Sequence, residues 1–342
     1  MTPRAAGGGF RAAEGGFRRR LAAVCGVLAA LLVLLVLGVV FSPDRVQARA
    51  AGQPLLPGAV PQRIVGIDIS AGATLVTSLR RTAKGWEMPS GQRTYPASSD
   101  RITTFLRIVT GLTRTSLVSR GASHLGELGL APDSARLVVL HQAAGGPDLA
   151  VEVGGRGPGG DADYVRVRGE QSVYLARGQV SFFLSQEPSS WYELHVLPDD
   201  VQGTTVASVT VSGSLPQEDP PGAVLGGEYT LRRPSADKLD QWTIDGESRP
   251  VDRVAAGAMA SALANLEGVD FADATAGFAA PSGGGLRVIV ETFAGRRYVL
   301  DVRRAPQPGK LLVRSDWSPW SWLVNPLALQ RAVLPASRLM SR

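Results

Sequence analysis

The segments PASSDRITTFLRIVTGL (residues 96–112) and PVDRVAAGAMASALANL (residues 250–266) decide the fold of this chain. Both open on proline, and apolar residues then recur at the spacing of one helix face. Four positions match at a constant offset of 154 residues: Pro96, Phe105, Val109 and Leu112 against Pro250, Met259, Leu263 and Leu266. Ser98 to Asp100 and Asp252 are residues of the kind that cap and begin helices. Each segment therefore predicts one amphipathic helix.

Short apolar runs flank the two helices in the same order. The first helix has runs at residues 64–69, 74–79, 85–88, 137–140 and 149–153, and the second has runs at 206–211, 228–233, 241–244, 286–290 and 298–302. Turn-forming residues at 145–147 and 294–295 separate the last two runs of each set, which is typical of antiparallel hairpins. We therefore expect an α+β fold with two tandem copies of a mainly antiparallel sheet-plus-helix unit, at residues 63–202 and 203–342. This is a duplication, because solenoid repeats are about 20 to 50 residues long.

Tryptophan occupies matching places before the two helices. Trp86 lies in the third run of the first copy, and Trp242 lies in the third run of the second copy. Large aromatic side chains at equivalent places of a repeat are most often buried. We predict that both side chains fill core positions.

The stretch LAAVCGVLAALLVLLVLGVVF, Leu21 to Phe41, carries no charge. At about 1.5 Å per residue a helix of this length crosses the roughly 30 Å hydrocarbon core of a bilayer. Arg18, Arg19 and Arg20 precede it directly, so the positive-inside rule makes residues 1–20 a cytoplasmic basic tail. Residues 42–62 are rich in Pro, Gly and Ala and read as a spacer. The expected location is the bacterial inner membrane, single-pass, with the C-terminal part in the periplasm. The alternative is cleavage after Ala48-Arg49-Ala50, which has the small-x-small form of a signal-peptidase site and would release the domain.

Charge and cysteine usage exclude some classes of function. The formal net charge is +6, but five arginines and one glutamate lie before residue 42, so the rest of the chain is nearly neutral. A nucleic-acid-binding protein would concentrate positive charge on its folded part, so no nucleic-acid partner is expected. Cys25 is the only cysteine, and the part beyond the apolar stretch therefore has no disulfide and no thiol nucleophile.

Catalytic, cofactor-binding and metal-binding residues are not predicted. The histidines His124, His141 and His195 lack the spacing of metal ligands on one helix or hairpin. The glycine-rich loop at 154–161 leads into an apolar strand pattern, whereas a phosphate-binding loop leads into a helix. It is interpreted as a hairpin tip. Asp68, Asp199 and Asp200 have the pattern of solvated turn residues.

Trp317, Trp320 and Trp322 fall within six residues near the C-terminus. If Trp320 and Trp322 alternate on a strand, they share one face of it. That face is either a wall of the core or a platform for a partner or ligand, and both interpretations stay open at this point.

The order of several motifs resembles a known family. The run Gly85-Trp86 through Tyr95-Pro96 into the helix, followed by Tyr164-Val165-Arg166-Val167 and Ser172-Val173-Tyr174-Leu175, is similar to the family called domain of unknown function 4340. The resemblance implies an α/β envelope protein anchored in the inner membrane, often encoded beside an ABC transporter permease and a gliding-motility-type auxiliary protein. It implies no catalytic residues. The chain departs from the pattern by inserting residues 154–163 and by lacking the tyrosine pair in its second copy, where Trp320 and Trp322 stand nearby.

The first functional hypothesis is a non-enzymatic accessory or scaffold of an ABC-type transport or gliding-motility-like system, with a permease or auxiliary subunit as its membrane partner. The alternatives are a periplasmic carbohydrate- or lipid-binding module that uses the C-terminal tryptophans, and an envelope hydrolase of unfamiliar type.

Overall fold

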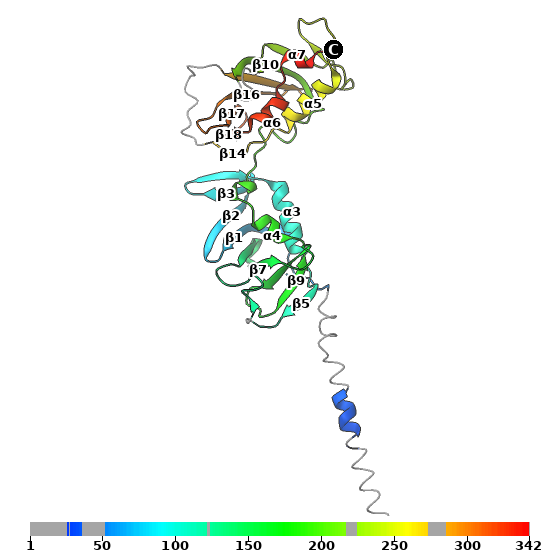
Figure 1. Cartoon of the computed structure of the whole chain (residues 1–342), viewed down its shortest axis with the longest axis vertical. Helices are drawn as coiled ribbons and strands as arrows, with labels where there is room; N and C mark the ends of the chain where they lie inside the picture. The colour runs from blue at the N-terminus through cyan, green and yellow to red at the C-terminus, as the bar shows by residue number, and fades with distance from the viewer. Residues whose placement is uncertain are drawn as a thin grey trace, which may run out of the picture. The chain divides into compact units, whose positions relative to one another are not determined.

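The computed structural model of the chain describes residues 26, 28–35, 52–121, 124–216, 224–272 and 285–341. They form two compact units, and Figure 1 labels the helices and strands and colours the chain by residue number. The first unit comprises the described parts of residues 1–84 and 100–186, and the second comprises those of 85–99 and 187–342. Two large antiparallel sheets and few helices make up the structure, so the predicted α+β class with mainly antiparallel strands is confirmed.

The N-terminal apolar stretch is described only in part. Residues 26 and 28–35 are helical, and the rest of the transmembrane helix predicted at 21–41 lies outside the described residues. None of the helices in the described ranges is long and apolar enough to span a bilayer.

The first sheet has the strand order β4-β3-β2-β1-β6-β7-β8-β9-β5. Its strands are β1 (Ile64–Ala71), β2 (Thr74–Thr82), β3 (Gly85–Ser90), β4 (Arg93–Ala97), β5 (Ser116–Ser119), β6 (Arg136–Gln142), β7 (Leu149–Arg156), β8 (Ala162–Val167) and β9 (Val173–Arg177). The helical elements in this part of the chain are η1 (Pro61–Arg63), α3 (Ser99–Thr110), η3 (Ala143–Gly145), α4 (Val180–Leu184) and η4 (Pro188–Trp191). The loop at 157–161 connects β7 to β8, so the predicted hairpin tip is confirmed there, whereas residues 154–156 of the predicted loop belong to β7.

The second sheet has the order β13-β12-β10-β15-β16-β17-β18-β14, and β11 pairs with β10 beside this path. Its strands are β10 (Val206–Pro216), β11 (Val224–Gly226), β12 (Tyr229–Arg232), β13 (Thr243–Ile244), β14 (Asp270–Phe271), β15 (Leu286–Thr292), β16 (Arg297–Arg304), β17 (Leu311–Ser315) and β18 (Ser321–Val324). Its helices are α5 (Arg253–Ala264), α6 (Pro326–Ala332) and α7 (Ala336–Leu339).

The two sheets share one topology. The first strand order becomes the second when each strand is replaced by its counterpart, apart from the additional strands β4 and β11. The counterparts of β1, β2, β3, β5, β6, β7, β8 and β9 are, in the same order, β10, β12, β13, β14, β15, β16, β17 and β18. A β-bulge also recurs at one place, between Ile64 and Gly66 on β1 and between Val206 and Ser208 on β10. Bulges are specific features of a backbone, so the registers of the two sheets can be compared residue by residue.

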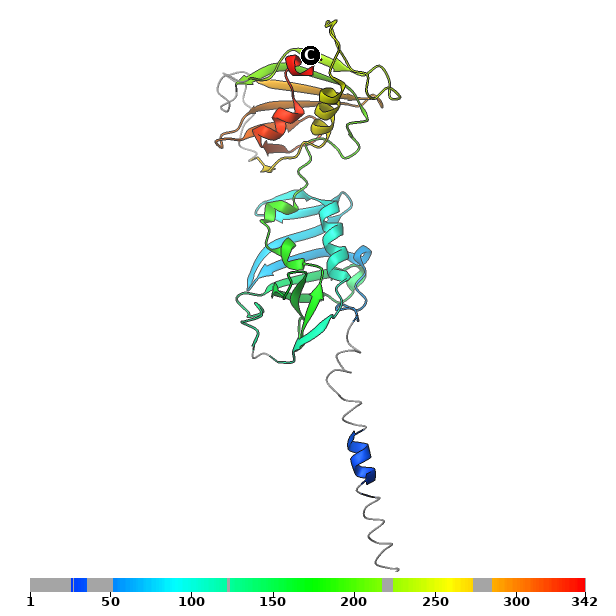
Figure 2. The same cartoon turned by 45° about the vertical axis from the view of Figure 1, so that its right-hand side comes forward.

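Helices lie across one face of each sheet (Figure 2). The strands send alternate side chains toward them, as Ile67 and Ile69 on β1 and Val288 and Val290 on β15 illustrate, and all four are buried. Burying an aliphatic side chain of this size stabilises the fold by about 1.5 to 3 kcal/mol. The apolar faces of the helices are also buried: Ile102, Phe105, Leu106 and Val109 on α3, and Ala256, Met259, Ala260, Leu263 and Ala264 on α5.

Several local predictions are confirmed. Trp86 is 8% exposed and Trp242 is 5% exposed, so both belong to the core. Asp252 caps α5, and its carboxylate accepts hydrogen bonds from the backbone N–H groups of Val254 and Ala255. The described end of the stretch expected to be a spacer differs from that prediction: Leu55 and Leu56 are buried, and the N–H of Leu55 donates to the carbonyl of Leu112 after α3.

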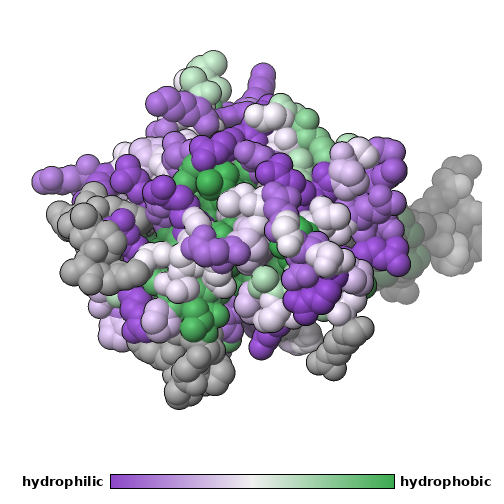
Figure 3. Space-filling view, turned by 90° about the horizontal axis from the view of Figure 1, so that it is seen from above, coloured by the Kyte–Doolittle hydropathy of each residue, from purple (hydrophilic) through white to green (hydrophobic). Residues whose placement is uncertain are grey.

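The sheet faces turned away from the helices are mixed in polarity. Val139 on β6 and Ala150 on β7 are half-buried neighbours on this face of the first sheet. Ile289 on β15 and Val299 on β16 are half-buried neighbours at the matching place of the second sheet. The molecular surface seen in Figure 3 is mostly hydrophilic, with separate small hydrophobic patches.

Candidate functional site

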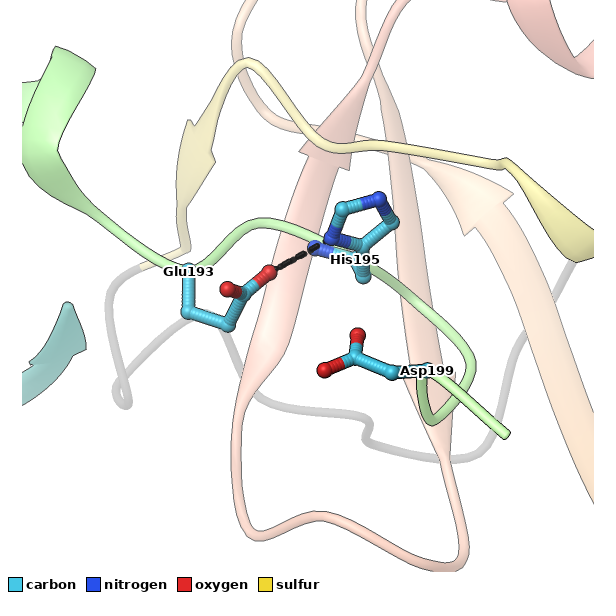
Figure 4. A group of neighbouring side chains, drawn as sticks. All are labelled: Glu193, His195 and Asp199. Atoms are coloured by element: carbon cyan, nitrogen blue, oxygen red, sulfur yellow. Dashed lines mark hydrogen bonds and ion pairs between the residues drawn. The ribbon is translucent and has the colours of Figure 1, made fainter. Parts of the chain in front are cut away.

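Three side chains with metal-ligating or proton-accepting atoms meet in the segment between η4 and β10 (Figure 4). Glu193, His195 and Asp199 each offer one such atom, and these atoms lie within 4.8 Å of one another. Glu193 and His195 are half-buried, whereas Asp199 is exposed.

Backbone pairing fixes the position of this segment within the second unit. His195 forms an isolated antiparallel bridge with Glu267, beyond the end of α5. The N–H of Val196 donates to the carbonyl of Leu266 at 2.9 Å, and the N–H of Gly268 donates to the carbonyl of Leu194 at 2.8 Å. The segment therefore runs beside the chain that leads from α5 into β14.

The imidazole of His195 lies between two carboxylates. Its Nδ1 is 2.6 Å from Oε1 of Glu193, and its Nε2 is 3.1 Å from Oε1 of Glu267. The hydrogen bond with Glu193, together with the charges of Glu193, Glu267 and Asp199, raises the pKa of His195 although partial burial opposes this. Burial raises the pKa of Glu193, but the hydrogen bonds from the His195 side chain and backbone outweigh it, so the net pKa is lowered. The arrangement favours the imidazolium, which donates to both carboxylates.

An imidazole nitrogen and two carboxylate oxygens are a donor set that Zn²⁺ uses in proteins. A metal ion must bind a deprotonated imidazole nitrogen, and here Glu193 and Glu267 occupy both nitrogens and favour the proton. The geometry therefore fits an ionic link between two chain segments better than a metal centre.

A second histidine lies between carboxylates in the first unit. His141 Nε2 is 2.8 Å from Asp68, and its Nδ1 is 3.0 Å from Asp148. Burial raises the pKa of Asp68, but hydrogen bonds from Arg80, His141 and Ser78 outweigh it and lower the pKa to about 2. Burial lowers the pKa of His141, and the hydrogen bonds with Asp68 and Asp148 reverse this, so the net pKa is raised. These groups lie on the sheet face turned away from the helices, beside Val139.

The three predicted tryptophans are brought close together in the second unit. Trp322 is 2% exposed and belongs to the core, and Trp320 is half-buried. Trp317 is 43% exposed, stacks on Trp322 at 6.4 Å and donates its Nε1–H to the carbonyl of Val196 at 2.8 Å. Trp317 therefore has the largest exposed fraction of the three side chains, whereas Trp322 belongs to the core.

Trp320 belongs to an aromatic group that also holds Tyr95, Tyr192 and Phe271. The ring of Tyr95 is 4.9 Å from those of Tyr192 and Trp320 and 5.1 Å from that of Phe271. Such ring pairs contribute about 0.5 to 1.5 kcal/mol beyond the area that they bury.

Only a weak signal in the sequence points to the His195 arrangement. Glu193 and His195 are two residues apart, so in extended chain they point to the same side. Glu267 is distant in sequence and reaches His195 only through the β-bridge, for which no local pattern exists.

Comparison of the chain with curated proteins and with solved structures gives no match. The family model described as domain of unknown function (DUF4340) matches residues 86–283, which is more than half of the 342 residues. The match begins at Trp86 on β3 and includes β4, α3, β8 and β9, the elements that contain the motifs on which the resemblance rests. The chain therefore belongs to the domain of unknown function 4340 family.

Proposed function

We propose that this chain is a non-enzymatic accessory or scaffold of an ABC-type transport or gliding-motility-like envelope system. In this proposal Leu21 to Phe41 anchor it in the bacterial inner membrane, the basic tail is cytoplasmic, and both sheets are in the periplasm. The length and lack of charge of the apolar stretch, and the arginines before it, support the anchor. The membrane partner is a permease or auxiliary subunit.

The observation that carries the proposal is the repeated apolar pair on the sheet faces turned away from the helices. Val139 lies between Asp68 and Ala150, and Ile289 lies between Thr210 and Val299. The shared bulge makes Val139 and Ile289 equivalent positions. Antiparallel sheets usually place polar side chains on a face turned to water. An apolar centre with polar neighbours is instead typical of a surface that docks a protein.

The test is photo-crosslinking of the full-length chain in native membranes. A photo-reactive phenylalanine analogue replaces Ile289 in one variant and Val139 in another, and mass spectrometry identifies the crosslinked proteins. The control position is Val254, which is 81% exposed on α5.

We expect crosslinks from Ile289 or Val139 to a transporter permease or auxiliary subunit, and none from Val254. Repeated crosslinking that recovers no transporter subunit from either sheet position would refute the accessory role. Equal yields from Val254 would show that the crosslinks do not depend on the proposed faces.

A further inference from the structure

The second sheet opens at one end, where β15 stops short of its two neighbours. β10 continues to Pro216, but its last pairing with β15 is Gly213 with Leu286. β16 continues to Arg304, but its last pairing with β15 is Val302 with Leu286. No described strand lies between the ends of β10 and β16. Because neighbouring strands lie about 4.8 Å apart, a missing strand leaves roughly 10 Å between the two that remain.

A cavity of about 400 Å³ lies at this opening. This volume is within the range of about 300 to 1,000 Å³ that is usual for small-molecule sites. Elements from three parts of the second unit line it: the end of β10 with β11, the hairpin from β16 to β17, and α6. Its apolar lining includes Leu215, Leu225, Leu311 and Leu327. Leu215 and Leu225 are almost fully buried, whereas Leu327 is 62% exposed at the margin.

The charged residues that the structure describes in the lining are all positive. Arg304 and Lys310 line the cavity, and the described lining contains no carboxylate. Arg304 spans the opening, because its Nη2 donates to the carbonyl of Pro216 at 2.8 Å. Lys310 is half-buried, and among the described residues no carboxylate forms an ion pair with its ammonium group. A half-buried cation beside an apolar cavity is screened weakly by salt and attracts anions.

We propose that this cavity binds an anionic amphiphile, with its acyl chain against the leucines and its carboxylate or phosphate head at Arg304 and Lys310. Among the described residues of the lining there is no aromatic ring on which a sugar would stack and no carboxylate that would bind a cation. The ligand chemistry is shared by a free fatty acid and by an acidic phospholipid, and the experiment below separates these sources. The site is independent of the sheet faces proposed to dock a transporter subunit.

The test uses the full-length chain in nanodiscs of phosphatidylcholine and a fluorescent stearate as the probe. Competitors are palmitate, the uncharged hexadecanol, and nanodiscs that contain phosphatidylglycerol. The rim variant Lys310→Gln removes one positive charge, and Leu327→Gln changes an exposed apolar side chain at the margin. The matched controls are Lys238→Gln and Val254→Gln, two exposed positions outside the cavity. Circular dichroism of each variant verifies that it is folded.

We expect saturable binding of the stearate that palmitate displaces and hexadecanol displaces at least tenfold less well. Lys310→Gln is expected to weaken binding about tenfold, which corresponds to the loss of one charge-assisted contact at about 1.4 kcal/mol. Leu327→Gln weakens it less, and both controls bind as the wild type does. Displacement by phosphatidylglycerol identifies a lipid source, and displacement by palmitate alone identifies a free fatty acid.

Equal displacement by palmitate and hexadecanol, or unchanged binding in Lys310→Gln, overturns the proposal. Absence of any saturable binding to the folded wild type also overturns it. If an extended peptide bound and Lys310→Gln did not weaken that binding, the cavity would instead be a site where a peptide adds a strand to the second sheet.

Discussion

The two sheets share one strand order, but at one equivalent pair of core positions they place the aromatic ring on different elements. In the first unit the ring is Phe105 on α3, and the strand position that faces Ile69 holds Thr77. In the second unit the helix position equivalent to Phe105 holds Met259, and the strand position equivalent to Thr77 holds Tyr229, opposite Val211. At these equivalent positions the aromatic ring thus lies on the helix beside the first sheet and on a strand of the second sheet.

The difference shows that topology and packing are specified separately. The order of apolar runs and turns sets the topology, and many combinations of apolar side chains fill a core if the total volume is kept. α5 buries alanine at 256, 260 and 264, one every four residues, so its backbone can approach its neighbours closely. Tyr229 then reaches past Met259, and its hydroxyl donates to the carbonyl of Leu334.

The largest expected effect comes from truncating the equivalent core residues. Phe105→Ala should lower the free energy of unfolding by about 3 to 5 kcal/mol and Met259→Ala by about 2 to 5 kcal/mol, because each leaves a cavity in a buried site. Both side chains are fully buried. Denaturant titration measures the loss, and hydrogen exchange with mass spectrometry locates it. Each variant should lose protection in its own unit, and equal loss in both units would show that the two do not fold separately.

Removal of the N-terminal cap of α5 should have a smaller effect on the free energy of unfolding. Asp252→Ala should destabilise the protein by about 1 kcal/mol, because the N–H groups of Val254 and Ala255 lose their acceptor. Asp252→Asn keeps a side-chain oxygen and is the control, expected to stay close to the wild type. Thermal unfolding measures both. If Asp252→Asn lost as much stability as Asp252→Ala, the charge of Asp252, and not its hydrogen bonds, would be what stabilises the helix.

Removal of the hydroxyl of Tyr229 tests the packing that is specific to the second unit. Tyr229→Phe should lower the free energy of unfolding by about 0.5 to 1.5 kcal/mol, because the carbonyl of the half-buried Leu334 loses its donor. Tyr298→Phe is the control, since the hydroxyl of Tyr298 has no hydrogen-bond partner among the described residues. Denaturant titration of the two variants side by side measures the difference. A Tyr229→Phe variant as stable as Tyr298→Phe would contradict the assigned bond.

The smallest expected effect is a pH dependence shared by the two units. The pKa values of His141 and His195 are both raised above 6.5 in the folded protein. Such a group binds its proton more tightly when folded, so its contribution is complete below pH 6.5 and is lost as the pH rises through the folded pKa. Unfolding free energies measured across this interval should fall with pH. The slope should decrease in His141→Gln and in His195→Gln and decrease most in the double variant; an unchanged slope there would exclude both histidines as the cause.

Much of the fold could be predicted because it is encoded in local patterns. The alternation at residues 64–69 and 206–211, the helical spacing after Pro96, and the cap at Asp252 each depend on neighbours within one turn or a few strand residues. The burial of Trp86 and Trp242 followed from their equivalent places in the repeat.

The sites could not be predicted because they depend on where distant strands end. His195 meets Glu267 only because the segment before β10 pairs with the chain after α5. The opening beside Arg304 exists because β15 begins at Leu286, several residues short of the end of β10. No periodicity in the sequence records the relative lengths of strands that are far apart in the chain.

The distribution of tryptophan gives the protein an optical probe that is weighted toward the second unit. Trp242, Trp317, Trp320 and Trp322 lie in the second unit, whereas Trp86 lies on β3 of the first sheet and Trp191 is buried outside the core of the second sheet. In a variant that carries Trp86→Phe and Trp191→Phe, emission excited at the red edge of indole absorption would therefore follow the second unit, whereas far-ultraviolet circular dichroism would follow both. Melting curves recorded by both methods on one sample of this variant would give the order in which the two units unfold.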